Sequence, residues 1–111
     1  MMSLSAQHKI KSIKSQNEIK QLLSSGKKIY TKFGIFFLGK SENPEKQVGV
    51  LVKKAVGIAV KRNYYKRVLR EYIRTNLNNF SEYNKIIFVI NKKIDIPFKQ
   101  LKKELDLKFL S

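Results

Sequence analysis

The chain has 111 residues but no cysteine, and its single histidine is His8. Without cysteine it has no disulfides within the chain or to a partner, no thiolate metal ligands and no cysteine nucleophile. A lone histidine in a polar N-terminal stretch is typical of a solvated side chain. With one histidine and no cysteine, the chain has almost no residues from which a zinc site or a Ser-His-Asp triad could be built. The sequence therefore argues against an enzyme that works through metal, thiol or triad chemistry.

Long apolar runs are missing as well. The longest, such as Ile35–Leu38 and Ile86–Ile90, are much shorter than the roughly 20 residues that a membrane-spanning helix needs. The first 14 residues contain no apolar segment of the kind that a secretory signal requires. We therefore predict a protein that does not span a membrane and that is located in the cytoplasm.

Acidic residues are few, because 8 Asp and Glu stand against 24 Lys and Arg, which gives a formal net charge of +16. The acids are scattered, and no pair of them has the spacing of a two-metal nuclease site. A field this positive attracts polyanions and accelerates their association. Nucleic acid is the first partner that this charge indicates, and an anionic membrane surface is the second. Apolar side chains make up 42% of the chain, enough for a folded core.

The pattern of apolar and turn residues predicts one domain, 1–111, with a flexible basic arm at 1–15. Asn17 is the predicted N-cap of the first helix, and Gly26 follows its end. The first two strands are expected to pair as an antiparallel hairpin. The order helix, strand, strand, helix, strand, helix, with room for an extra short strand, predicts an α+β fold with helices on a small, mostly antiparallel sheet. These elements are expected at residues 17–25, 28–38, 47–53, 62–76, 86–90 and from 97 onward.

The fourth of these segments carries the clearest pattern. At about 100° per residue, Tyr65, Val68, Leu69 and Tyr72 share a core face. The opposite face collects like charges, and repulsive pairs such as Lys66 and Arg70 cost stability unless phosphate relieves them. Arginine also meets phosphate oxygens with two hydrogen bonds and stacks on bases. The pattern therefore predicts a nucleic-acid-binding helix, and the residues on that face are Arg62, Asn63, Lys66, Arg67, Arg70 and Arg74.

Aromatic residues in the strand at 28–38 are a second feature. Alternation places Phe33 and Phe37 on one face and Phe36 on the other. If the first pair faces the core, Phe36 is exposed and its ring is available to stack on an unpaired base. The alternative is that all three rings pack in the core.

The stretch Val48–Glu71 resembles the bacterial ribonuclease P protein. The third residue of the family's Arg-Asn-Arg signature is Tyr64 here. Weaker similarity extends through 19–38, 83–90 and the last helix. The matching positions are Val48, Gly49, Lys54, Val56, Gly57, Ala59, Val60, Arg62, Asn63, Lys66, Arg67, Arg70 and Glu71.

This resemblance implies a left-handed βαβ crossover and a partner, the ribonuclease P RNA, that carries out Mg²⁺-dependent hydrolysis of precursor tRNA. The protein itself is expected to hold no catalytic residue and no metal. Phe33 and Phe36 become candidates for contact with the 5′ leader, in a cleft between sheet and helices. The residues expected to bind RNA are Lys53, Lys54, Lys61, Arg62, Asn63, Lys66, Arg67, Arg70 and Arg74.

Two other classes remain open from the sequence. A ribosomal or other structural RNA-binding protein explains the charge and size equally well. Only the Val48–Glu71 match favours a ribonuclease P protein over this alternative. A DNA-binding or membrane-surface protein is the other, since an amphipathic basic helix can lie on anionic lipid. In so small a domain, however, the apolar side of that helix is needed for the core.

Overall fold

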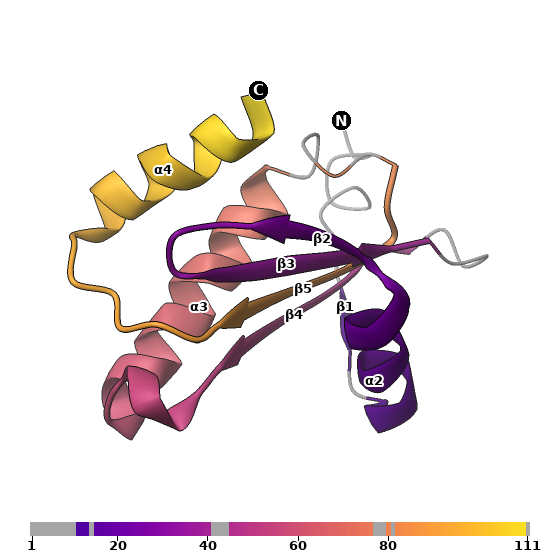
Figure 1. Cartoon of the computed structure of the whole chain (residues 1–111), viewed down its shortest axis with the longest axis horizontal. Helices are drawn as coiled ribbons and strands as arrows, with labels where there is room; N and C mark the ends of the chain where they lie inside the picture. The colour runs from indigo at the N-terminus through magenta and orange to yellow at the C-terminus, as the bar shows by residue number, and fades with distance from the viewer. Residues whose placement is uncertain (1–10, 14, 41–44, 77–79, 81, 111) are drawn as a thin grey trace, which may run out of the picture.

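The computed structural model describes residues 11–13, 15–40, 45–76, 80 and 82–110. Its described elements are an α+β arrangement of one mixed sheet with helices on both faces, which confirms the predicted fold class (Figure 1). In chain order they are β1 (Lys11–Ser12), α2 (Gln16–Ser25), β2 (Lys27–Tyr30), β3 (Gly34–Gly39), β4 (Gln47–Val52), the 3-10 helix η1 (Lys54–Val56), α3 (Ala59–Thr75), β5 (Lys85–Ile90) and α4 (Phe98–Leu110).

The strand order is β1-β4-β5-β3-β2. β5 runs parallel to β4 and antiparallel to β3, so the predicted direct pairing of the segments 28–38 and 47–53 is wrong. β5 takes the central place because its side chains are buried on both faces, as Ile86, Ile87 and Phe88 are. A strand of that kind needs a neighbour on each side and cover above and below.

The segment predicted as one strand at 28–38 is instead a hairpin of β2 and β3. Thr31 closes its turn, since its Oγ1 donates to the Gly34 carbonyl at 2.8 Å and accepts from the Gly34 amide at 3.1 Å. Gly34 then enters β3 so close to β5 that a Cβ on it would lie 2.1 Å from the Val89 carbonyl oxygen. Only glycine fits the backbone at this position.

Gly34→Ala is therefore expected to lower the free energy of unfolding by about 3 kcal/mol, at the upper end for overpacking, because the obstacle is backbone. Urea unfolding followed by circular dichroism measures the change. Gly49→Ala is the matched control, since a Cβ there would meet Ile87 at 3.7 Å, an ordinary contact. Equal stability of the two variants would mean that β3 shifts away from β5 without cost.

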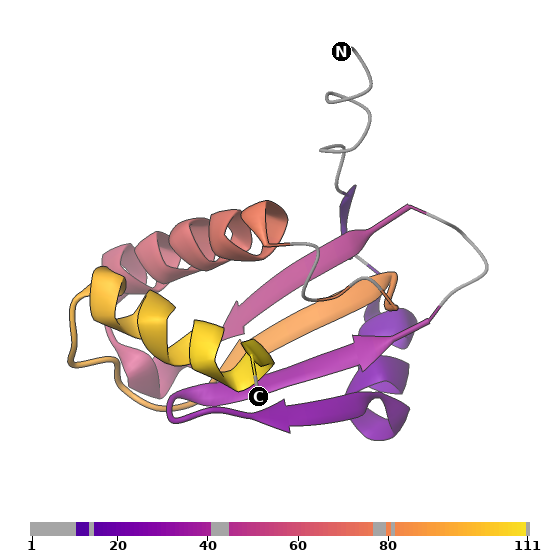
Figure 2. The ribbon, with the colours of Figure 1, turned by 90° about the horizontal axis from the view of Figure 1, so that it is seen from above.

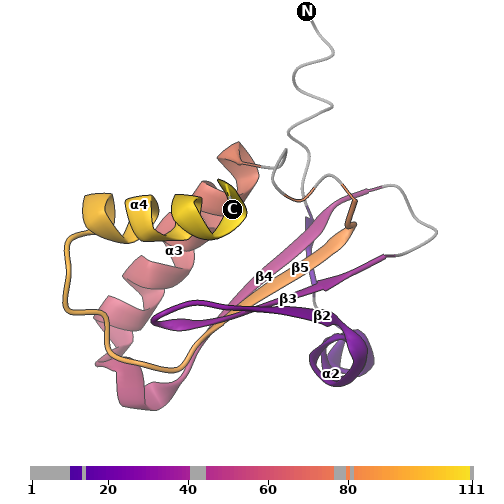
Figure 3. The same ribbon diagram turned by 45° about the horizontal axis from the view of Figure 1, so that its top comes forward.

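The helices divide between the two faces of the sheet, with α3 and α4 on one and α2 on the other (Figure 3). Followed in Figure 2, the crossover from β4 through α3 to β5 is left-handed, as the resemblance implies. Parallel crossovers are right-handed in about 98% of cases. A short connection that contains η1 leads from the end of β4 to the start of α3.

The larger core lies under α3 and α4. It joins one face of the sheet to the buried sides of both helices, through residues that include Phe36, Val48, Val50, Leu69, Tyr72, Ile73, Ile86, Phe88, Leu101 and Leu105. A smaller core of Ile13, Leu22, Phe37 and Ile87 lies under α2. An ion pair of 3.2 Å between Glu18 and Lys85 also fastens α2 to β5.

Most of the predicted N-terminal arm, residues 1–10 and 14, lies outside the described residues. The prediction is wrong for 11–13, since β1 pairs with β4 and Ile13 is buried. The first helix is capped by Ser15 rather than Asn17, because the Ser15 side chain accepts from the Glu18 amide at 3.4 Å. Gly26 follows the end of this helix as predicted.

Candidate nucleic-acid interface

The apolar side of α3 fixes how its basic side is presented. Leu69, Tyr72 and Ile73 are buried against the sheet and α4, and Tyr65 and Val68 are partly buried. The predicted core face is therefore present, rotated slightly toward Ile73. α3 also begins at Ala59, three residues earlier than predicted.

The charged side of α3 contains both exposed and half-buried side chains. Asn63, Arg67 and Arg70 are exposed, whereas Arg62 and Lys66 are half-buried. Arg62 does not lie opposite the core as predicted, since its Nε donates to the Gly57 carbonyl at 3.1 Å. That bond holds the guanidinium group against the turn that precedes α3.

Arg74, at the end of this side, pairs with the only acid on α3. Its Nε donates to Glu71 Oε1 at 3.0 Å and a second nitrogen bonds Oε2. The hydrogen bond and the charge of Glu71 raise the pKa of Arg74. This pair leaves Arg67 and Arg70 as the exposed guanidinium groups in the middle of the surface.

Three predicted lysines extend this surface toward the sheet. Lys53 and Lys54 are exposed where β4 passes into η1, and Lys61 is exposed in the first turn of α3. All nine residues predicted to bind RNA thus belong to one continuous segment, 53–74. We call the residues of this segment the basic surface, and they are Lys53, Lys54, Lys61, Arg62, Asn63, Lys66, Arg67, Arg70 and Arg74.

Phe36 is not exposed, so that prediction is wrong. Its ring stacks on Phe88 with centroids 3.9 Å apart and an angle of 6°, and it meets Phe80 at 5.6 Å. Its exposed fraction is 0%, and that of Phe33 is 4%. Alternation did separate Phe36 from Phe37, but helices cover both faces of the sheet there. Neither leader candidate presents a ring surface on which a base would stack.

A different row of side chains lies on the face of the sheet that carries α2. Strand register aligns one residue from each of four strands, namely Tyr30, Ile35, Val89 and Leu51. Tyr30 is 61% exposed and Leu51 37%, while Ile35 and Val89 are partly buried. α2 covers the next row, which holds Phe37 and Ile87. We call the four residues the open row.

Sequence alternation does not predict the open row, because it predicts one strand at 28–38 where the structure has the hairpin of β2 and β3. With the hairpin known, the period-2 pattern places Tyr30 and Ile35 on the same face. Lys28, two residues before Tyr30, adds a positive charge beside the row, with its Nζ 5.9 Å from the Phe37 ring.

Two negative findings apply to the described part of the chain. No group of three or more His, Asp or Glu side chains there could hold a metal ion. None of the helices described is long and apolar enough to cross a membrane.

Fold and surface together define a small basic α+β protein that carries six of its 24 Lys and Arg residues on α3. A family model described as Ribonuclease P matches residues 8–110. A Fusobacterium nucleatum protein named ribonuclease P protein component is 30% identical over 102 residues, which cover 87% of this chain and 92% of that protein. The chain belongs to the ribonuclease P protein family, and hence to tRNA processing.

Solved structures share the fold. The RNase P protein of Staphylococcus aureus superposes with a TM-score of 0.79 at 21% identity, covering 92% of this chain and 94% of that one. The RNase P protein of Thermotoga maritima gives 0.75 at 20% identity, covering 91% and 97%.

Proposed function

We propose that this protein binds the ribonuclease P RNA through the basic surface and assists that RNA in removing the 5′ leader from precursor tRNA. The observation that carries the proposal is the gathering of nine polar and charged residues, eight of them cationic, on one segment of a chain with a net charge of +16. Arg67 and Arg70 are exposed there, and a guanidinium group can bind phosphate with two hydrogen bonds.

The hydrolysis is assigned to the RNA, with Mg²⁺ as its metal. Support comes from the sequence, which has no cysteine and one histidine. It also comes from the described side chains, which form no cluster of acids that would bind two metal ions. The protein then contributes binding and orientation.

Reconstitution tests the proposal. Added to ribonuclease P RNA from the same genome at low Mg²⁺, the protein is expected to restore leader cleavage that the RNA alone performs poorly. RNA-free protein is expected to cleave nothing. Leader removal by RNA-free protein, or no stimulation of the RNA at any Mg²⁺ concentration, would contradict the proposal.

The open row is the proposed leader contact. Tyr30 offers an exposed ring, and Ile35 and Leu51 extend an apolar surface beside it, with the charge of Lys28 next to the row. A single strand is held by base stacking and backbone charge without strong sequence preference. The proposed leader contact is therefore tolerant of base identity.

Tyr30→Ala is expected to weaken holoenzyme binding of precursor tRNA by about 1–3 kcal/mol, the value of one stacked base. Mature tRNA lacks a leader, so its affinity is expected to stay the same. Equilibrium binding of both RNAs measures the difference, with Leu107→Ala, an exposed position on α4, as control. Equal losses for the two RNAs would remove the open row as the leader contact.

A further inference from the structure

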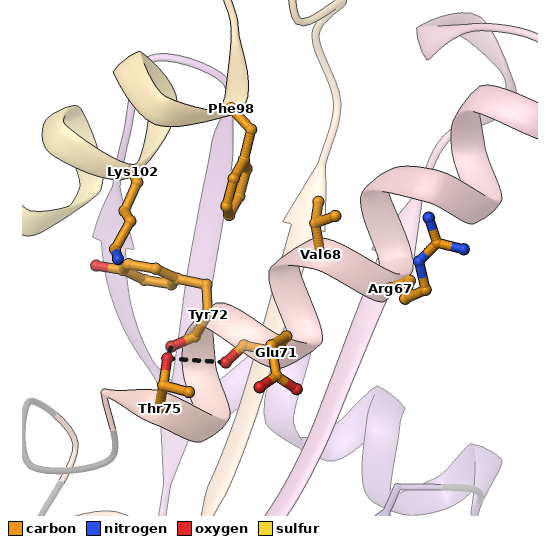
Figure 4. Close-up of a pocket in the computed structure, with 7 residues that line it drawn as sticks. All are labelled: Arg67, Val68, Glu71, Tyr72, Thr75, Phe98 and Lys102. Atoms are coloured by element: carbon orange, nitrogen blue, oxygen red, sulfur yellow. Dashed lines mark hydrogen bonds between the residues drawn. The ribbon is translucent and has the colours of Figure 1, made fainter.

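A groove of about 500 Å³ runs between α3 and α4, beside the basic surface (Figure 4). In Figure 4, Phe98 and Lys102 reach into it from α4, while Val68 and Tyr72 face them from α3. The groove is lined by Arg67, Val68, Glu71, Tyr72, Thr75, Phe98 and Lys102.

The floor of this groove is held in place. The Tyr72 hydroxyl donates to Asp106 Oδ1 at 2.7 Å, which ties α3 to α4. Burial, and then the hydrogen bond and charge of Asp106, raise the pKa of Tyr72, so its phenol stays neutral. Thr75 Oγ1 bonds the Glu71 and Tyr72 carbonyls at 3.0 and 3.1 Å. The shape of the groove is therefore set by the fold before anything binds.

Tyr64 continues the same stripe of α3 beyond the groove. Residues 64, 68 and 72 are spaced by four, so they lie along one side of the helix. Tyr64 is 41% exposed, and its ring centroid lies 5.7 Å from the Arg67 guanidinium carbon. Its edge meets Tyr65 at 5.5 Å. An exposed ring thus lies between a neighbouring ring and a cation.

Charge at the groove favours an anion at its rim. Arg67 and Lys102 contribute cations from the two helices. The acid on the α3 wall, Glu71, is paired with Arg74, and Asp106 accepts the Tyr72 hydroxyl. Rings inside and cations at the edge match a nucleotide, whose base is flat and apolar on its faces and whose phosphate is charged. A wholly apolar partner leaves the two cations without a role.

We propose that the groove between α3 and α4, with Tyr64 at its end, binds an unpaired nucleobase of the ribonuclease P RNA. The proposal rests on the proposed function, since it needs the basic surface to hold the same RNA. In this arrangement the phosphate contacts Arg67, at the rim of the groove, and the base lies against Phe98 inside it.

Affinity for the ribonuclease P RNA alone, measured across a range of salt, separates stacking from charge. Tyr64→Ala and Phe98→Leu are each expected to weaken binding about tenfold and to leave the slope of log affinity against log salt unchanged. Arg67→Ala is expected to flatten that slope by about 0.7–0.9. Phe98→Leu keeps an apolar side chain against the core, so folding is preserved. Leu107→Ala, on the other side of α4, is the control.

Fluorescence gives a direct readout, because the chain has no tryptophan. Tyr64→Trp adds a single indole, whose emission is expected to be quenched when the RNA binds. Leu107→Trp is expected to change little. Tight RNA binding with unquenched Trp at 64 and full affinity in Tyr64→Ala and Phe98→Leu would overturn the groove and leave the proposed function intact. Absence of RNA binding by the wild type would overturn both.

Discussion

Replacing Lys66, Arg67 and Arg70 together with alanine is expected to lower affinity for the ribonuclease P RNA by about two orders of magnitude at about 0.1 M salt. Each phosphate contact releases roughly 0.7–0.9 counterion, which is worth somewhat less than tenfold at that concentration. The loss falls on binding and not on folding, because Arg67 and Arg70 are exposed and their removal relieves repulsion along α3.

Filter binding at several salt concentrations measures this effect as a slope, which is expected to fall by about 2. The matched control replaces Lys20, Lys27 and Lys40, three exposed lysines away from α3, and lowers the net charge equally, from +16 to +13. Equal losses in the two triple variants would show that the overall charge of the protein, rather than the basic surface, holds the RNA.

Phe36→Ala is expected to lower the free energy of unfolding by about 3–5 kcal/mol, the usual range for a buried phenylalanine. The ring is fully buried and contacts Phe88 and Phe80, so its loss leaves a cavity between β3, β5 and Phe80. A domain of this size has only about 5–15 kcal/mol in total. The Phe36→Ala protein is therefore expected to have little stability left, and a substantial fraction of its molecules is expected to be unfolded at growth temperature.

Urea and thermal unfolding measure this loss, and Tyr30→Ala, at an exposed position, is expected to change stability by no more than about 0.5 kcal/mol. The folded fraction of Phe36→Ala is expected to keep the normal ratio of affinities for precursor and mature tRNA. A stable Phe36→Ala protein with a selective loss for precursor tRNA would restore Phe36 as a leader contact.

The helices and the fold class were accessible from the sequence because their signals are local. The spacing of Val68, Leu69 and Tyr72 indicates the buried side of α3 wherever that helix packs. Its start at Ala59 was missed because its cap, Ile58, offers no side-chain hydrogen bond to mark the boundary. The exposed positions of Asn63, Arg67 and Arg70 follow from the same period, whereas Lys53, Lys54 and Lys61 were expected from the resemblance. Arg62 and Lys66 are half-buried because, at about 100° per residue, they fall roughly 20° and 60° from Leu69 on the helix.

Strand pairing and the open row were not accessible, because they depend on contacts far apart in the chain. No sequence feature near Leu38 or Gln47 indicates that β5, some 40 residues later in the chain, lies between β3 and β4 in the sheet. The turn at Thr31–Phe33 has no strong turn dipeptide, so β2 and β3 read as one strand. Whether the Phe36 ring is buried depends on which face of the sheet α3 and α4 cover, and the alternation of side chains does not determine that.

The central position of β5 also sets the order in which the molecule can assemble during translation. β3 and β4 are synthesised once Val52 is made, but they do not pair with each other. Each of them pairs with β5, so this part of the sheet cannot form until Lys85–Ile90 has been synthesised. Until then two strand edges stay open and α3 has no finished sheet to pack on. A nascent chain that stops before Lys85 therefore carries the whole of α3 without the central strand of the sheet against which α3 packs.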